Sequence, residues 1–169
     1  MDVAMATEAA GVMTFADKGD MTRAEIDQLM NYLVGKKKEG HFRSFWETFG
    51  QSVNLMTSGE VLIESMWSPA VTAARAEGIN CIYATLQEGY RGWHSGLTIS
   101  AKVTGSALDQ AYEYLNWWLN GWAGAFQARM GYYHPIPANV QKYLSAAEWD
   151  YWYMGKPAAE ALSDPWGNP

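Results

Sequence analysis

The chain is poor in the residues that build disulfides and transition-metal sites. It has a single cysteine, Cys81, and three histidines in 169 residues. One cysteine cannot form an internal disulfide, and no histidine has a second histidine or cysteine at metal-ligand spacing, which argues against zinc. Because Cys81 lies within the apolar run from Ile79 to Tyr83, we interpret it as an inert, buried thiol.

Other familiar signals are also missing. No apolar run approaches the length of a membrane span, and the first residues lack the basic start and apolar stretch of a signal peptide, which by itself indicates a cytoplasmic chain. The chain has no Gly-x-Ser-x-Gly, Gly-x-Gly-x-x-Gly or phosphate-loop motif. Its net charge of −6 argues against a nucleic-acid partner. No carboxylate has an evident catalytic partner, so we expect neither an enzyme nor a bound cofactor.

Aromatic residues are the feature that is plentiful. Hydrophobic residues make up 49% and charged residues 18% of the chain, which is typical of one globular domain. Nine tryptophans and ten tyrosines are more than a core of this size needs. Since both side chains join an apolar ring to a polar group, they are enriched where proteins bind ligands and partners.

The order of apolar and turn-forming residues predicts an α/β fold. Helices are expected at residues 2–15, after a capping box formed by Thr22 and Glu25, at residues 51–57, and from Pro69 to Glu77. Strands are expected within residues 41–49, where the strand runs into a loop, and at 60–67, 79–86 and 97–101, and their alternation with helices indicates a mainly parallel sheet. After residue 105 the pattern is helical, with a break near Gly121 and one or two short helices over residues 138–155.

Two tryptophans are candidates for one binding site. Trp67 ends the expected strand 60–67, and Trp93 lies in a glycine-containing segment that begins at Glu88. Loops after strands are where α/β proteins place binding groups. The alternative for both indoles is that they pack in the core. Tyr132 precedes a proline-rich turn, so its phenol either faces a cleft or does not, and the sequence leaves both alternatives open. The helical spacing of Trp117, Trp118 and Trp122 favours core packing for these three.

Several short motifs occur in an order that is similar to a known family. They are Ser58-Gly59-Glu60-Val61 followed by Met66-Trp67, then Ala76-Glu77-Gly78-Ile79, then Gln87-Glu88-Gly89 followed by Trp93, and finally Gly131-Tyr132 through Pro137-Ala138-Asn139. This order resembles the extracellular solute-binding proteins of ABC transporters, and most closely the spermidine/putrescine-binding type. The similarity spans about residues 20–168.

The resemblance implies a type II periplasmic-binding-protein fold, in which two α/β lobes hold a small solute between them. It also implies a partial chain that lacks the N-terminal segment of the first lobe and the C-terminal end. Residues 1–96 would form most of the second lobe, residues 97–145 a crossing strand and the last helices of the first lobe, and residues 146–169 a return segment and truncated tail. The location would be periplasmic and the protein partner an ABC transporter permease, with no insertion into the membrane.

The resemblance assigns ligand contacts to Trp67, Trp93 and Tyr132. Ser95 stands where polyamine binders have an aspartate that pairs with a ligand amine, and a hydroxyl supplies no charge. A smaller amine or an amino acid therefore fits as well as a polyamine. Glu88, in the same loop, completes the expected site. Two other hypotheses remain open: a stand-alone aromatic-rich module, for instance for carbohydrates, and an interaction domain that oligomerises through its aromatic residues.

Overall fold

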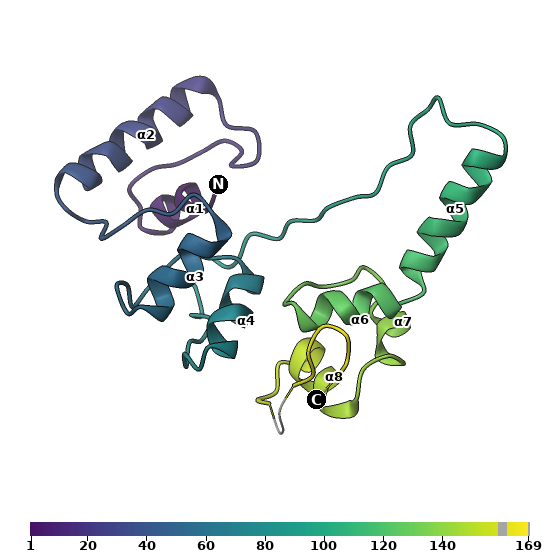
Figure 1. Ribbon diagram of the computed structural model, residues 1–169. Coiled ribbons are helices and arrows are strands. Elements are labelled where there is room, and N and C mark those ends of the chain that lie inside the picture. The colour runs from purple at the N-terminus through teal and green to yellow at the C-terminus, as the bar shows by residue number, and fades with distance from the viewer. Residues whose placement is uncertain (159–161, 169) are drawn as a thin grey trace. The chain divides into compact units, whose positions relative to one another are not determined.

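The computed structural model describes residues 1–158 and 162–168. In these ranges all regular structure is helical (Figure 1). The helices are α1 (Asp2–Ala9), α2 (Arg23–Lys38), α3 (Phe49–Thr57), α4 (Ser68–Ala76), α5 (Ser106–Leu119), α6 (Trp122–Arg129), α7 (Pro137–Gln141) and α8 (Ala146–Met154).

The expected α/β fold with a parallel sheet is wrong for this structure. The segments expected as strands are irregular, and apolar side chains within them are exposed: Leu62 is 89%, Ile63 92% and Ile82 81% exposed. An alternating pattern shows only which side chains would share one face of a strand. The backbone N–H and C=O groups of a strand need a neighbouring strand as partner, and the described residues supply none.

The expected helices are confirmed where their starts depend on local residues, but the helix expected over residues 2–15 ends at Ala9. Thr22 accepts a hydrogen bond from the Glu25 amide while the Glu25 side chain accepts one from the Thr22 amide, as the sequence predicted. The same reciprocal box opens α3 and α8. Pro69 lies in the first turn of α4, where its missing N–H has no helical partner to lose. The starts of these four helices are thus specified within about four residues of sequence.

The capping box of α2 gives a stability prediction. Thr22→Ala removes the oxygen that accepts the Glu25 amide hydrogen bond, so the free energy of unfolding is expected to fall by about 1 kcal/mol. Thr22→Ser keeps the hydroxyl and is expected to keep most of that stability. Urea denaturation of the three proteins is the measurement, and equal midpoints for Thr22→Ala and wild type would contradict the assigned cap.

The chain divides into two compact units. The N-terminal unit joins Met1–Glu47 to Ile82–Ser95, and the C-terminal unit joins Thr48–Cys81 to the described residues after Ser95. In the N-terminal unit, Ala4 of α1, Phe15 and Leu29 of α2 form a small buried cluster, with Met13 and Met21 packed against it. The assignment of residues 1–96, 97–145 and 146–169 to lobes of a larger fold stays a prediction.

The core of the C-terminal unit is built largely from small residues. Helix α3 packs against α4, and α6 packs against α5 and α7. Alanines supply most of the buried positions of α4 and α6, namely Ala70, Ala74, Ala123, Ala125 and Ala128. Gly121 separates α5 from α6 with a φ of +109°, and a Cβ there would lie 2.0 Å from the Asn139 carbonyl oxygen. The break predicted near Gly121 is therefore confirmed, and it is the close approach of α7 that requires glycine.

Helix α5 does not behave as the core helix that its pattern predicts. None of its residues is buried. Trp117 is 47% and Trp122, the first residue of α6, is 42% exposed, so the expectation of core packing is wrong for these two. Their rings instead contact other aromatic rings, with 5.9 Å between the Trp117 and Trp122 centroids. Ring–ring contact replaces burial along this face.

Candidate functional site

Two of the expected ligand contacts, Trp67 and Tyr132, adjoin one tertiary contact. Trp67 is the N-cap residue of α4, with extended backbone angles, and Ser68 follows it. The Ser68 hydroxyl donates a 2.8 Å hydrogen bond to the carbonyl oxygen of Gly131, and Tyr132 comes directly after Gly131. The fold therefore joins the chain next to Trp67 with the chain next to Tyr132, although 63 residues separate the bonded pair.

The geometry of Gly131 keeps these two segments close. Gly131 has a φ of +88°, and a Cβ there would lie 2.5 Å from the Thr72 hydroxyl and 3.0 Å from the Ser68 carbonyl oxygen. The Tyr132 amide donates to the Gln127 carbonyl at 3.0 Å, which closes the last turn of α6. The turn at Gly131 thus lies directly on the start of α4, and it depends on having no side chain.

Both aromatic side chains at this contact are partly open to solvent. Trp67 is 43% and Tyr132 37% exposed. The neighbouring Tyr133 ring packs edge-on against Tyr153, with 6.0 Å between centroids. Exposed aromatic faces beside a fixed backbone contact are suited to stacking on a ligand. Packing of Trp67 in the core, the alternative interpretation of its sequence position, does not occur in this structure.

An acidic side chain with unusual surroundings lies three residues before Trp67. Both carboxylate oxygens of Glu64 are buried and have no hydrogen-bond partner among the described residues. Burial raises the pKa of Glu64 above its usual range, because a less polar surrounding disfavours the charged form. Most buried polar atoms in proteins are hydrogen-bonded, so this carboxyl group is an exception that calls for a physical reason.

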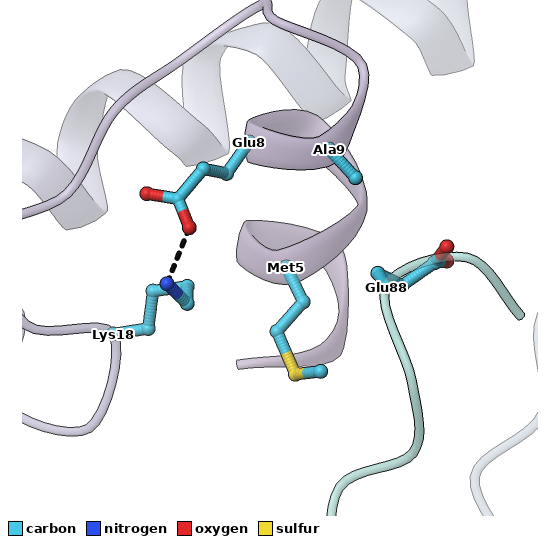
Figure 2. A pocket seen from close by; sticks show the side chains of 5 residues that line it. All are labelled: Met5, Glu8, Ala9, Lys18 and Glu88. Carbon is cyan, nitrogen blue, oxygen red and sulfur yellow. Dashed lines mark hydrogen bonds and ion pairs between the residues drawn. The ribbon is translucent and has the colours of Figure 1, made fainter.

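The other expected site residues belong to the N-terminal unit. Glu88 borders an open hollow of about 220 Å³ with four further residues, Met5, Glu8, Ala9 and Lys18 (Figure 2). Lys18 forms an ion pair with Glu8, and this hydrogen bond is the main cause that lowers the pKa of Glu8. Figure 2 shows the carboxylate of Glu88 pointing away from that pair.

Helix α1 also contacts the segment that carries Trp93. Arg91 Nε lies 3.2 Å from a carboxylate oxygen of Asp2, the first residue of α1. Trp93 is 58% exposed and Ser95 is exposed. The Asp2–Arg91 ion pair therefore holds two charged groups close to the Trp93 loop, and Trp93 itself is not a core residue here. The expected approach of Trp93 to Trp67, which belongs to the other unit, stays a prediction.

A second open hollow lies in the C-terminal unit, with a volume of about 610 Å³. It is lined by residues of α5, α7 and the segments after α5 and before α7: Asn116, Trp117, Leu119, Asn120, Ile136 and Asn139. The Asn139 amide donates to the Leu119 carbonyl at 2.8 Å, and Lys142 donates to the Asn120 side chain at 2.8 Å. These bonds fix two of the amide groups beside an exposed indole.

Among the residues that the structure describes, no group of three or more His, Cys, Asp or Glu side chains is arranged to hold a metal ion. Cys81 is only half-buried, so the expectation of a buried thiol is met in part, and its sulfur lies 3.9 Å from the Val71 carbonyl oxygen. Among the same residues, no helix has both the length and the apolar character needed to cross a membrane.

Sequence reasoning missed Glu64 as a notable residue. It is one of several carboxylates in the sequence, and among them Glu88 is the one in a glycine-flanked loop beside an aromatic residue. The available signal was a charged residue inside the apolar run from Val61 to Trp67, since an acidic side chain in such a run is either paired or functional. The Ser68–Gly131 hydrogen bond had no signal in the sequence, because it joins segments that are distant along the chain.

The chain was compared with protein families, with curated proteins and with solved structures. The family model described as bacterial extracellular solute-binding protein matches residues 2–156. Neither the curated proteins nor the solved structures gave a match. The family match includes most of both units and all five residues expected from the sequence as ligand contacts.

Proposed function

The chain belongs to the bacterial extracellular solute-binding proteins, and from that premise we propose that its ligand is a small amine, polyamine or amino-acid-like solute. Proteins of this family bind solutes outside the cell for ABC transport and are generally not enzymes. The proposal adds the ligand class, the spermidine/putrescine type, and a chain that is part of a larger two-lobed protein. Its protein partner is then the permease of an ABC importer.

The hydrogen bond between Ser68 and Gly131 is the observation that carries this proposal. Its two members are the sequence neighbours of Trp67 and Tyr132, which the family resemblance names independently as ligand contacts. Aromatic faces attract a cationic amine with about 0.5–2 kcal/mol per ring, most strongly where water is excluded. Two partly exposed rings next to one hydrogen-bonded contact are therefore suited to an alkylamine.

In the proposed mechanism, the solute is captured by closure of two lobes around it. Trp67 and Tyr132 contribute two aromatic faces, while a third ring, that of Trp93, with the hydroxyl of Ser95 and the carboxylate of Glu88, stays an expectation from the family resemblance. Closure removes water from the solute, which strengthens each polar contact. The permease then distinguishes the closed form from the open one, and no covalent bond is made or broken.

Carbohydrate binding is the second candidate function. The observation in its favour is the hollow lined by Trp117 and by three asparagines, Asn116, Asn120 and Asn139. An indole face stacks on a sugar ring, and amide groups match its hydroxyls as donors and acceptors. This hollow is also suited to the aromatic-rich binding module considered from the sequence.

A titration of the full chain with three classes of solute tests the proposal. The probes are putrescine and spermidine, a set of amino acids, and a set of neutral sugars, each followed by calorimetry and by the shift in melting temperature. A shift with the amines or amino acids supports the proposed ligand class. Binding of sugars alone would support the second candidate, and binding of none of the three would reject both.

Trp67→Ala is expected to weaken amine binding by about two- to thirtyfold, because the cation–π contact of one ring is worth roughly 0.5–2 kcal/mol. Trp117→Ala is the matched control, since this indole is exposed to a similar degree, 47% against 43%. Calorimetry with putrescine should separate the two variants. Equal losses in both, or a loss in Trp117→Ala alone, would contradict the role given to Trp67.

A further inference from the structure

Glu64 has a carboxyl group whose environment is unfavourable in the absence of a ligand. Its two oxygens are buried without a hydrogen-bond partner among the described residues. A buried polar group without a partner is unfavourable, and a charged one is more so, because its hydration is lost without replacement. Binding a proton reduces this cost, but the resulting O–H is again a donor without an acceptor. The described part of the fold therefore leaves this group unsatisfied in either state.

Arg75, the cationic residue closest to Glu64 along the chain, does not form a hydrogen bond with it. Arg75, at the end of α4, donates from Nε to the Cys81 carbonyl oxygen at 2.9 Å and from a terminal nitrogen to the Tyr151 hydroxyl at 2.7 Å. The buried guanidinium of Arg129 is likewise engaged by Glu148. Both arginines thus have their own acceptors.

Glu64 lies close in sequence to Trp67, one of the two aromatic residues of the proposed site. It lies three residues before Trp67, in the irregular segment between α3 and α4, and the end of that segment is tied to Gly131 by the Ser68 hydroxyl. The neighbours of Glu64 in this segment are open to solvent, with Leu62 89% and Ile63 92% exposed. An anchoring role requires the Glu64 side chain to rotate, so that its buried carboxylate turns toward a ligand beside Trp67.

We propose that Glu64 is the anionic anchor of the ligand site, where its carboxylate pairs with a protonated amine while Trp67 and Tyr132 stack on the ligand. This inference rests on the proposed function and deepens it by assigning the charge that Ser95 does not supply. The unsatisfied carboxylate gains a charge-assisted hydrogen bond on binding, so the site is selective for cationic solutes over neutral ones.

Glu64→Gln tests this assignment, because the amide keeps the shape of the side chain and removes its charge. In calorimetry of the full chain with putrescine, the dissociation constant is expected to rise by about ten- to hundredfold, as a hydrogen bond to a charged group is worth roughly 1.5–3 kcal/mol. The matched control is Glu77→Gln, an exposed carboxylate at the C-cap of α4. Its dissociation constant should equal that of wild type.

The melting temperature of the same variants distinguishes an anchor from a structural carboxylate. A neutral amide costs less to bury than a carboxylate, so Glu64→Gln is expected to melt higher than wild type at pH 7. Because burial raises the pKa of Glu64, the folded wild type holds this proton more tightly and loses stability as pH rises above about 4.5. The advantage of Glu64→Gln should therefore shrink as pH is lowered to about 4.

The outcomes separate this inference from the proposed function. Weaker putrescine binding together with a higher melting temperature in Glu64→Gln supports the anchor. Unchanged putrescine binding in Glu64→Gln, with a loss in Trp67→Ala, overturns the anchor and leaves the amine-binding function in place. If wild type binds sugars but neither amines nor amino acids, the anchor for a protonated amine is wrong, while a solute-binding role remains.

Discussion

Arg129→Met is expected to lower the free energy of unfolding by about 3–5 kcal/mol, because it leaves the carboxylate of Glu148 buried without its cation. The two side chains are 10% and 5% exposed. Arg129 Nε donates to one Glu148 oxygen at 2.6 Å, and a terminal nitrogen donates to the other at 3.2 Å and to the Tyr143 carbonyl at 3.0 Å. This paired geometry joins α6 to α8.

An exposed ion pair of the same type provides the control. Arg23 and Asp27 on α2 lie 2.9 Å apart with side chains 87% and 54% exposed. Arg23→Met is expected to cost at most about 0.5 kcal/mol, because such pairs are screened by water. Urea denaturation should thus give a large difference between the two methionine variants. A small effect of Arg129→Met, close to that of Arg23→Met, would mean that the α6–α8 pair is accessible to water.

The double variant Arg129→Met with Glu148→Gln shows how much of the loss in Arg129→Met comes from leaving the Glu148 charge buried without a partner. The glutamine side chain would keep an oxygen for the Ser145 amide, which now donates to Glu148 at 2.7 Å, so the capping box of α8 is retained. The double variant is expected to be more stable than Arg129→Met alone, because no charge is left buried. If the loss of unfolding free energy in the double variant equals the sum of the losses in Arg129→Met and Glu148→Gln, the two residues are not coupled.

The Arg129–Glu148 ion pair is expected to make the stability of the protein depend on pH. Burial acts to raise the pKa of Glu148, but the hydrogen bonds from Arg129 and from the Ser145 amide outweigh it and lower the pKa below the usual 4.5. The unfolded chain therefore binds the proton first, and the contribution of the pair is fully present above about pH 4.5 and is lost as pH falls further. The stability difference between wild type and the double variant should narrow over that acidic range.

The helical part of the fold was predictable because its determinants are local. Thr22 and Glu25 specify the start of α2, and Pro69 specifies the start of α4, without reference to the rest of the chain. Gly121 was also readable as a break, although its physical reason, the approach of the Asn139 carbonyl, is not visible in the sequence. Helix hydrogen bonds close within the segment, so a short window of sequence carries the needed information.

The prediction of strands was wrong because strand formation depends on residues that are distant along the chain. Residues 60–67 and 79–86 have the apolar character of strands, but pairing is decided by a partner elsewhere in the chain or outside it. In the structure their apolar residues Leu62, Ile63 and Ile82 are exposed instead. The error on α5 has the same origin, since a helical stripe containing Trp117 shows which side chains share a face and not what covers that face.

For the site, the sequence motifs led to Trp67 and Tyr132, and the Ser68–Gly131 hydrogen bond supplied the tertiary contact between their neighbours. Glu64 became notable only when its oxygens proved to be buried without a partner. A pattern can indicate residue types that bind amines, but an unsatisfied polar atom is a property of three-dimensional surroundings. The joint role of Trp93, Ser95 and Glu88 with these residues remains a prediction.

Gly131→Ala is expected to damage the site and the stability of the C-terminal unit together. A left-handed φ of +88° is unfavourable for alanine by about 1–2 kcal/mol. The added Cβ would also lie 2.5 Å from the Thr72 hydroxyl and 3.0 Å from the Pro69 Cα, and relief of such overlap costs a further 1–3 kcal/mol or so. The start of α4 must move away from the turn, which separates the neighbours of Trp67 and Tyr132 and weakens amine binding.

Gly155→Ala isolates the part of this effect that comes from backbone strain. Gly155 has a φ of +66°, and a Cβ there would have no atom within 4 Å. It is expected to lose only the roughly 1–2 kcal/mol of the left-handed conformation and to bind putrescine like wild type. Urea denaturation and calorimetry on both variants give the comparison. If Gly131→Ala matches Gly155→Ala in both measurements, the contact between α4 and the Gly131 turn does not shape the ligand site, and the observation behind the proposed function loses its force.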